Sequence, residues 1–153
     1  MNAEETLAPL EVPLAAAWPG RHRIGNFELQ SIVTQSNAGL VYRAWDHVLA
    51  RPVAIKEYLP AALARRGSGG EVEPSRPESA DAFDRGRRAF IEEARTLGRC
   101  DHPSLVRVLD LIEARGTAYR VMPWYSGRVL FDVCRRMSGP LSEPALRLLL
   151  DNL

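Results

Sequence analysis

Polar and apolar residues alternate along the first half of the chain with the period of two that is typical of half-buried β-strands. This alternation predicts three strands, over residues 27–33, 40–45 and 52–58, with a polar loop over 34–39. In the third strand, Ala54 and Lys56 are expected on one face, and Val53 and Ile55 on the other. The lysine therefore shares its face with a small residue, which leaves room there for a ligand.

The pattern then becomes helical. Apolar residues recur at helical spacing at Phe83, Phe90, Ala94 and Leu97. Glu93 lies beside this apolar face, so its carboxylate is expected to point toward the body of the protein.

Weaker patterns fill the rest of the chain. Two further strands are predicted over 105–112 and 117–122, a short helix over 129–137, and a final helix for which Ser142 is the N-cap. Residues 1–22 are rich in Ala and Pro and predict a tail, and residues 60–80 predict a loop without a core-forming pattern.

Composition narrows the classes of function. The 153 residues carry 20 basic and 19 acidic side chains, interspersed, so no basic patch indicates binding to nucleic acid or to an anionic membrane. No run is long enough to span a bilayer and no signal peptide is recognisable, so a cytoplasmic location is expected. Cys100 and Cys134 lack metal-ligand spacing, so they are expected to be buried or idle thiols, and no metal site is predicted.

Lys56 is the only lysine beside nineteen arginines. A compact ammonium at such a place indicates a site that a planar guanidinium does not fit, such as a phosphate site. The flanking run Val53-Ala54-Ile55-Lys56 matches a signature in which a strand lysine holds the phosphates of ATP. The alternative is a surface lysine at the end of an ordinary strand.

Several spacings join this run into a larger pattern. Val41 follows Gly39 by two residues and Lys56 follows Gly39 by seventeen, while the segment His102-Pro103-Ser104-Leu105-Val106 begins nine residues after Glu93. The segment 119–125 has the sequence Tyr-Arg-Val-Met-Pro-Trp-Tyr. From about Ile24 to its end, the chain resembles the small lobe of a protein kinase, followed by the hinge and the first helices of the large lobe. The resemblance is to bacterial Ser/Thr kinases.

This resemblance implies an α+β fold, with a five-stranded antiparallel sheet, one packed helix and a partial helical large lobe. The implied domain organisation is a tail over 1–22, a small lobe over 23–122 with an insertion near 60–80, a hinge over 123–128, and truncated large-lobe helices over 129–153.

The resemblance also implies the site. Lys56 would bind phosphate and Glu93 would orient Lys56 through an ion pair. Nucleotide-binding residues by position are Val33, Gly39, Val41, Ala54, Lys56, Met122 as gatekeeper, Pro123 and Tyr125. Taken singly, Val41, Ala54 and Met122 are better explained by core packing.

Departures from the family pattern weaken this expectation. Thr34 and Ser36 replace two glycines of the phosphate loop, and Val129 replaces a ribose-binding acid. No His-Arg-Asp or Asp-Phe-Gly segment occurs, so the magnesium ligands and the catalytic base are missing and the chain alone is expected to be inactive. The sequence thus predicts the ATP-binding portion of a Ser/Thr kinase. The alternatives are an inactive kinase-like interaction module and a gene remnant.

The last helix carries an apolar face. Leu146, Leu149, Leu150 and Leu153 are spaced so that they line one side of it. We expect this face to seek a cover, through self-association or a protein partner, and we interpret it as the mark of a truncated domain.

Overall fold

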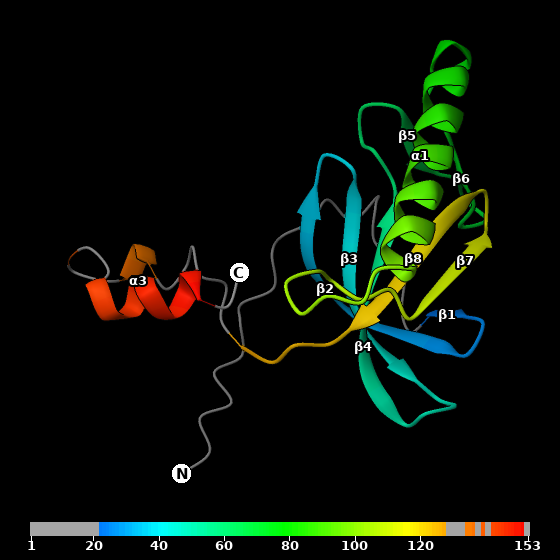
Figure 1. Ribbon diagram of the computed structural model, residues 1–153. Helices are drawn as coiled ribbons and strands as arrows, with labels where there is room; N and C mark the ends of the chain where they lie inside the picture. Colours follow the sequence, from blue (N-terminus) through cyan, green and yellow to red (C-terminus); the bar gives the residue numbers. More distant parts are fainter. Residues whose placement is uncertain (1–21, 128–133, 137–138, 140–141, 152–153) are drawn as a thin grey trace.

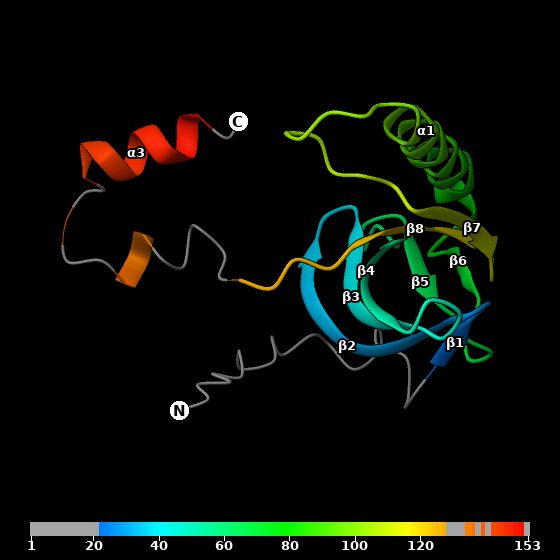
Figure 2. The same cartoon turned by 60° about the horizontal axis from the view of Figure 1, so that its bottom comes forward.

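The computed structural model describes residues 22–127, 134–136, 139 and 142–151. Its main feature is a curled antiparallel sheet with one long helix packed on it (Figures 1 and 2). The strands, in spatial order, are β1 (His22–Ile24), β2 (Phe27–Ser36), β3 (Gly39–Asp46), β4 (Arg51–Tyr58), β8 (Thr117–Pro123) and β7 (Asp110–Ala114). The α+β fold class predicted from the sequence is confirmed.

The sheet has six strands where five were predicted. The additional strand is β1, whose Ile24 is buried and pairs with Phe27 across a tight turn. Gly25 has a φ of 56° in that turn, a conformation that glycine adopts without steric cost. A three-residue strand is too short to show a period of two, which is why the sequence pattern missed it.

The hairpin between β2 and β3 is tighter than predicted. Thr34 pairs with Val41 and Ser36 pairs with Gly39, so the strands leave only Asn37 and Ala38 to form the turn. The predicted loop over 34–39 is therefore wrong. The end of β2 is exposed, and exposed strand residues need not carry an apolar signal.

The segment over 60–80 is not a plain loop. It contains β5 (Ala64–Arg66) and β6 (Val72–Pro74), which form a two-stranded sheet, and the short 3-10 helix η1 (Pro77–Ser79). Ala64 and Val72 are buried in the common core, and the Val72 N–H donates to the carbonyl of Arg115 in the turn between β7 and β8. Two buried hydrophobic residues in so long a segment give too weak a pattern to predict from sequence.

The long helix is α1 (Ala80–Gly98), and it confirms the helix predicted from the apolar spacing. Phe83 and Phe90 are buried, and their rings lie 5.4 and 5.7 Å from the ring of Tyr58. Tyr58 is the last residue of β4, so these contacts dock α1 on the face of β4 that alternation also assigns to Lys56.

Near the C-terminus, α3 (Glu143–Leu150) confirms the predicted last helix, and the Leu146 N–H donates to the carbonyl of Ser142. The predicted helix over 129–137 lies mostly outside the described residues, as does the predicted tail. Cys100 and Cys134 are free and exposed, so of the two expected alternatives, buried or idle thiols, burial is wrong. No helix in the described ranges has the length and hydropathy needed to cross a bilayer.

Candidate functional site

Three adjacent strands gather four of the predicted site residues on one face. Val41 of β3 lies opposite Lys56 of β4, and Ala54 of β4 lies opposite Met122 of β8. Residues directly opposite in an antiparallel pair project from the same face. All four are partly exposed, whereas the intervening residues Leu40, Tyr42, Val53, Ile55 and Val121 are buried. One face of the sheet is therefore packed, and the other is open at these four positions.

Gly39 begins β3 at a point where no side chain fits. Its φ is 146°, and a Cβ atom built there would lie 1.9 Å from the carbonyl oxygen of Glu57. The close approach of β3 to β4 thus requires glycine at this position, whether or not a ligand binds nearby. Ile32 pairs with Tyr42, and Thr34 pairs with the adjacent β3 residue, Val41. Val33 therefore has no partner of its own in β3 and is the additional residue of a bulge.

The predicted hinge residues follow the open face. Pro123 ends β8 opposite Val53, and Tyr125 is 70% exposed. Between them, the Trp124 ring lies 5.5 Å from the guanidinium carbon of Arg43. Arg43 is the register partner of Ala54, so this cation–π contact borders the open face. Sequence reasoning did not identify Arg43 or Trp124, although period two places Arg43 on the Val41 face.

The predicted ion pair between Lys56 and Glu93 is not formed. Glu93 instead accepts a hydrogen bond from Arg120 of β8, with 2.9 Å between Nη1 and Oε1. Arg120 is the register partner of Lys56, so the two cations lie side by side on one face. Lys56 makes no hydrogen bond or ion pair with another described residue. Glu93 does point toward the sheet as predicted, but its partner is the neighbouring arginine.

A second acidic residue occupies the opposite face of β4. Glu57 is fully buried, and its carboxylate accepts hydrogen bonds from the hydroxyls of Tyr42 (2.6 Å) and Tyr119 (2.9 Å) and from Arg66 of β5 (2.6 Å). Burial, together with the charge of Glu57, raises the pKa of both tyrosines above the usual phenol range. Sequence reasoning missed this cluster. Its visible signal was an acid, Glu57, at the alternating position that follows Val53 and Ile55 along the same strand.

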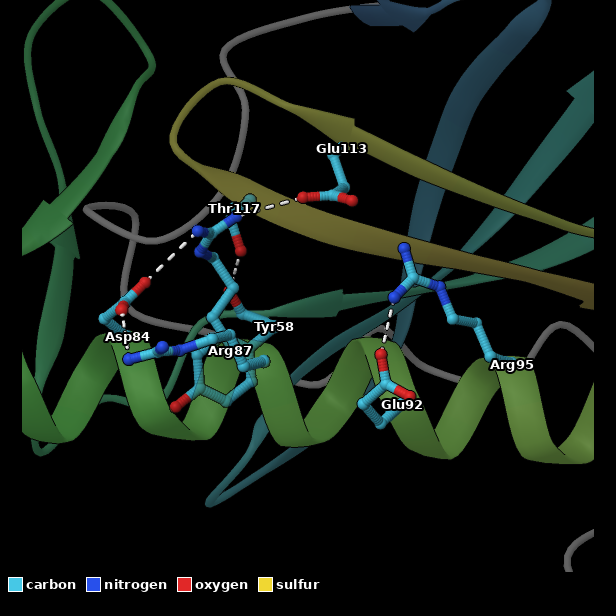
Figure 3. Close-up of polar contacts among 8 residues, drawn as sticks. Tyr58, Asp84, Arg87, Glu92, Arg95, Glu113 and Thr117 are labelled. Carbon is cyan, nitrogen blue, oxygen red and sulfur yellow. Dashed lines mark hydrogen bonds and ion pairs between the residues drawn. The ribbon is translucent and has the colours of Figure 1, made fainter.

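Further polar contacts fix α1 against the rest of the lobe, as Figure 3 shows. Arg87 bridges Asp84 of its own helix and Glu113 of β7, at 3.2 Å to each. The Thr117 hydroxyl of β8 donates to the carbonyl of Tyr58. These contacts tie the helix to β7, and the end of β4 to β8, which places Glu93 over the β8 side of the sheet.

Two other regions of the described chain lie apart from the predicted site or lack its chemistry. An open cavity of about 490 Å³ lies between β6, α1 and the β7–β8 turn, and its lining contains none of the predicted site residues. Within the described ranges, no group of three or more His, Cys, Asp or Glu side chains is arranged to hold a metal ion.

Comparison with known proteins bears on the kinase resemblance. The chain is 33% identical over 130 residues to the DNA damage-responsive serine/threonine-protein kinase RqkA of Deinococcus radiodurans. It superposes on the solved structure of PpkA-294 in its apo form with a TM-score of 0.75 and 38% identity, over 80% of this chain and 43% of that one. The chain belongs to the protein kinase superfamily.

Other comparisons agree with this assignment. The CBL-interacting protein kinase 22 of Oryza sativa subsp. japonica is 33% identical over 126 residues. A crystal structure of Rad53 residues 1–466 with AMP-PNP has a TM-score of 0.58, over 81% of this chain and 27% of that one, and at 21% identity it bears on the fold alone. No family model matches the sequence.

The shared region is a small part of these kinases. The matched residues are 82% of this chain but 15% of RqkA, and 80% of this chain but 27% of the rice kinase. The similarity therefore concerns a Ser/Thr-kinase-like lobe and not the whole of either relative.

Proposed function

We propose that this chain binds an adenine nucleotide on the open face of β3, β4 and β8, as the ATP-binding portion of a Ser/Thr protein kinase. The observation that carries the proposal is the register that brings the only lysine onto one partly exposed face with Val41, Ala54 and Met122. A cation beside small and apolar side chains matches a ligand with a flat apolar base and a phosphate tail.

The residues present fit the nucleotide. Val41 and Ala54 would contact the base, Lys56 would neutralise phosphate charge, and Val33 and Gly39 would border the phosphates. At the hinge, the Pro123 carbonyl and the Tyr125 N–H would hydrogen-bond the edge of the base. Proline fits its position because only its carbonyl is used. ATP supplies the transferable phosphoryl group when it is bound to a complete kinase domain.

The described residues do not fit a magnesium site, because none of them form an acidic cluster. The expected activity of the chain itself is weak and largely magnesium-independent nucleotide binding, without phosphoryl transfer. Phosphorylation of protein hydroxyls, and a cytoplasmic location, are proposed for the whole protein.

Isothermal titration of the 153-residue chain with ATP, in magnesium and in EDTA, tests the proposal. Lys56→Met should weaken binding at least about tenfold, as expected when a charge-assisted contact to phosphate is lost. The control is Arg95→Met, which removes an exposed α1 cation that pairs only with Glu92 among the described residues. Equal binding by the chain and by Lys56→Met would contradict the proposal, and tight binding that requires magnesium would reveal a metal site elsewhere in the chain.

A second candidate function is that of an inactive interaction module. Leu105, Val106 and Leu109, between α1 and β7, are exposed, as are Leu146, Leu148 and Leu150 of α3. Apolar residues gathered in exposed segments are typical of surfaces that contact another protein or another copy. Under this alternative, ATP does not bind, and light scattering after size exclusion finds self-association that charged substitutions at Leu105 and Val106 remove.

A further inference from the structure

Two cations face one carboxylate on the open side of the sheet. Lys56 and Arg120 lie directly opposite each other on β4 and β8. Glu93 of α1, the helix packed on this face, accepts a hydrogen bond from Arg120. Like charges directly opposite on a sheet repel unless an anion lies between them. The position of Glu93 therefore decides which of the two cations is neutralised.

In this arrangement Arg120 takes the carboxylate. The Arg120 side chain is only 7% exposed, and its Nε is buried without a hydrogen-bond partner among the described residues. A buried cation with few partners depends strongly on its single counter-charge. Lys56 is more open to solvent, so it depends less on Glu93.

A second contact with α1 also holds the Arg120 side chain in place. The guanidinium carbon of Arg120 lies 5.2 Å from the centre of the Phe90 ring, one helical turn before Glu93. Both contacts come from α1, whose Phe83 and Phe90 are packed on Tyr58. The helix is thus docked on the sheet while its Glu93 pairs with Arg120.

We infer that Arg120 is a positioning residue that withholds Glu93 from Lys56, so that the resting chain holds its phosphate-binding lysine unoriented. This inference rests on the proposed function, because the consequence concerns nucleotide affinity. An unpaired lysine keeps its rotamer freedom and loses more of it when it meets phosphate, which lowers affinity. Removal of Arg120 releases Glu93 to the neighbouring cation.

The single lysine makes the experiment direct. In a ¹⁵N-lysine-labelled chain, Lys56 provides the only side-chain ammonium signal, and an ion pair slows the exchange of its protons with water. The wild-type ammonium is expected to exchange rapidly. In Arg120→Met, slow exchange and a shifted signal are expected, and the double variant Arg120→Met/Glu93→Gln should return to rapid exchange.

Controls keep the result interpretable. Arg95→Met removes an arginine of the same helix that pairs with Glu92, and it should leave the Lys56 signal unchanged. Glu93→Gln alone should also leave that signal unchanged, which tests the inference even if Arg120→Met does not fold. A wild-type signal that already depends on Glu93, or a folded Arg120→Met chain with an unchanged signal, would overturn the inference.

Nucleotide titration separates the inference from the function on which it rests. Arg120→Met should bind ATP about fivefold more tightly than wild type, and the gain should vanish with Glu93→Gln. If no variant binds ATP, the proposed function fails while the ammonium signals still decide whether Arg120 withholds Glu93. If wild type binds ATP and the signals shift without a gain in affinity, the consequence drawn for Lys56 is wrong.

Discussion

Two glutamates on opposite faces of the sheet, Glu57 of β4 and Glu93 of α1, are held in contrasting ways. Glu57 belongs to the strand, has no exposed surface, and accepts from Arg66, Tyr42 and Tyr119. Glu93 comes from α1, has a side chain that is 57% exposed, and accepts from Arg120 alone among the described side chains. The first carboxylate lies in a closed network, and the second rests on one contact.

The contrast distinguishes the contacts that fix the fold, those of Glu57, from the contact that can rearrange, that of Glu93. Lys56 and Glu57 are adjacent, and alternation along the strand puts them on opposite faces. The closed network joins β4 to the β5–β6 hairpin through Arg66, so the strand is held from the side away from the candidate site. A strand held in this way allows Glu93 to exchange partners without loss of the fold. The segment over 60–80 therefore has a physical role in stabilising the strand that carries the lysine.

The largest expected effect comes from Glu57→Gln. Glutamine keeps the size of the side chain but removes the negative charge that Glu57 places beside Arg66, whose side chain is 4% exposed. Loss of one partner of a buried pair costs about 3–5 kcal/mol. Urea denaturation monitored by circular dichroism measures the change in the free energy of unfolding.

Glu73→Gln provides the matched control in the same hairpin. Glu73 pairs with Arg65 at 2.7 Å, but both side chains are about half exposed, so its loss should cost less than about 1 kcal/mol. If the two glutamine variants lost the same stability, the closed network would contribute no more than a surface pair, and the contrast with Glu93 would disappear.

The sequence predicted the elements with clear periodicity and failed where distant contacts decide. Alternation gave the strands around Lys56 and the face it occupies, and helical spacing gave α1 with Glu93 directed toward the sheet. The partner of Glu93 could not be predicted, because it depends on which residue of β8 lies opposite Lys56. That register is set by the whole sheet and not by any local pattern.

The segment over 60–80 shows the same limit of prediction from sequence. Residues 60–80 have little apolar content, and their two strands are also tied to distant parts of the chain, to β4 through Arg66 and to the β7–β8 turn through Val72. The buried acid at Glu57 carried a local signal, since it alternates with apolar residues that face the core. An isolated acid in such a position predicts a buried partner. That the partner is Arg66 could not be predicted, because it depends on how the segment over 60–80 packs against β4.

The next largest effect is expected for Tyr119→Phe, which removes one hydrogen bond to the Glu57 carboxylate. Hydrogen bonds to charged groups are worth about 1.5–3 kcal/mol, so the variant should be less stable by that amount at pH 7. The measurement is again the free energy of unfolding in urea. A loss below that of Glu73→Gln would show that the Tyr119 contact contributes nothing to the network.

The same variant has a distinct pH dependence. Burial and the Glu57 charge raise the pKa of Tyr119 in the folded chain, whereas the unfolded tyrosine titrates near 10. The stability from the neutral phenol is fully present below pH 10 and is lost as pH rises, because the unfolded chain releases the proton first. The gap between wild type and Tyr119→Phe should shrink by about 1 kcal/mol between pH 10 and pH 11. A gap that widens would reverse this assignment.

A smaller effect is expected for Glu93→Gln. Its side chain is mostly exposed and glutamine retains an oxygen that can accept from Arg120, so the free energy of unfolding should fall by about 1 kcal/mol or less. Urea denaturation alongside Glu57→Gln makes the comparison quantitative. A loss as large as that of Glu57→Gln would show that Glu93 is as firmly fixed as the buried acid, and would weaken the view that it can exchange partners.

The smallest effect concerns His22 at the start of β1. Its Nε2 is buried, and desolvation, with the charges of Arg115 and Arg66, lowers the pKa of the imidazole. The unfolded histidine titrates near 6.5, so the stability from the neutral ring is present above that pH and is lost as pH falls toward the lower folded value. The gap in melting temperature between wild type and His22→Gln should therefore narrow from pH 7.5 to pH 5.5.

Arg115→Asn, which suits the φ of 50° at that position, removes one of the two charges and should make the narrowing smaller. An unchanged narrowing would leave desolvation and Arg66 as the causes, and a gap that widens in acid would show that the folded chain favours the charged ring.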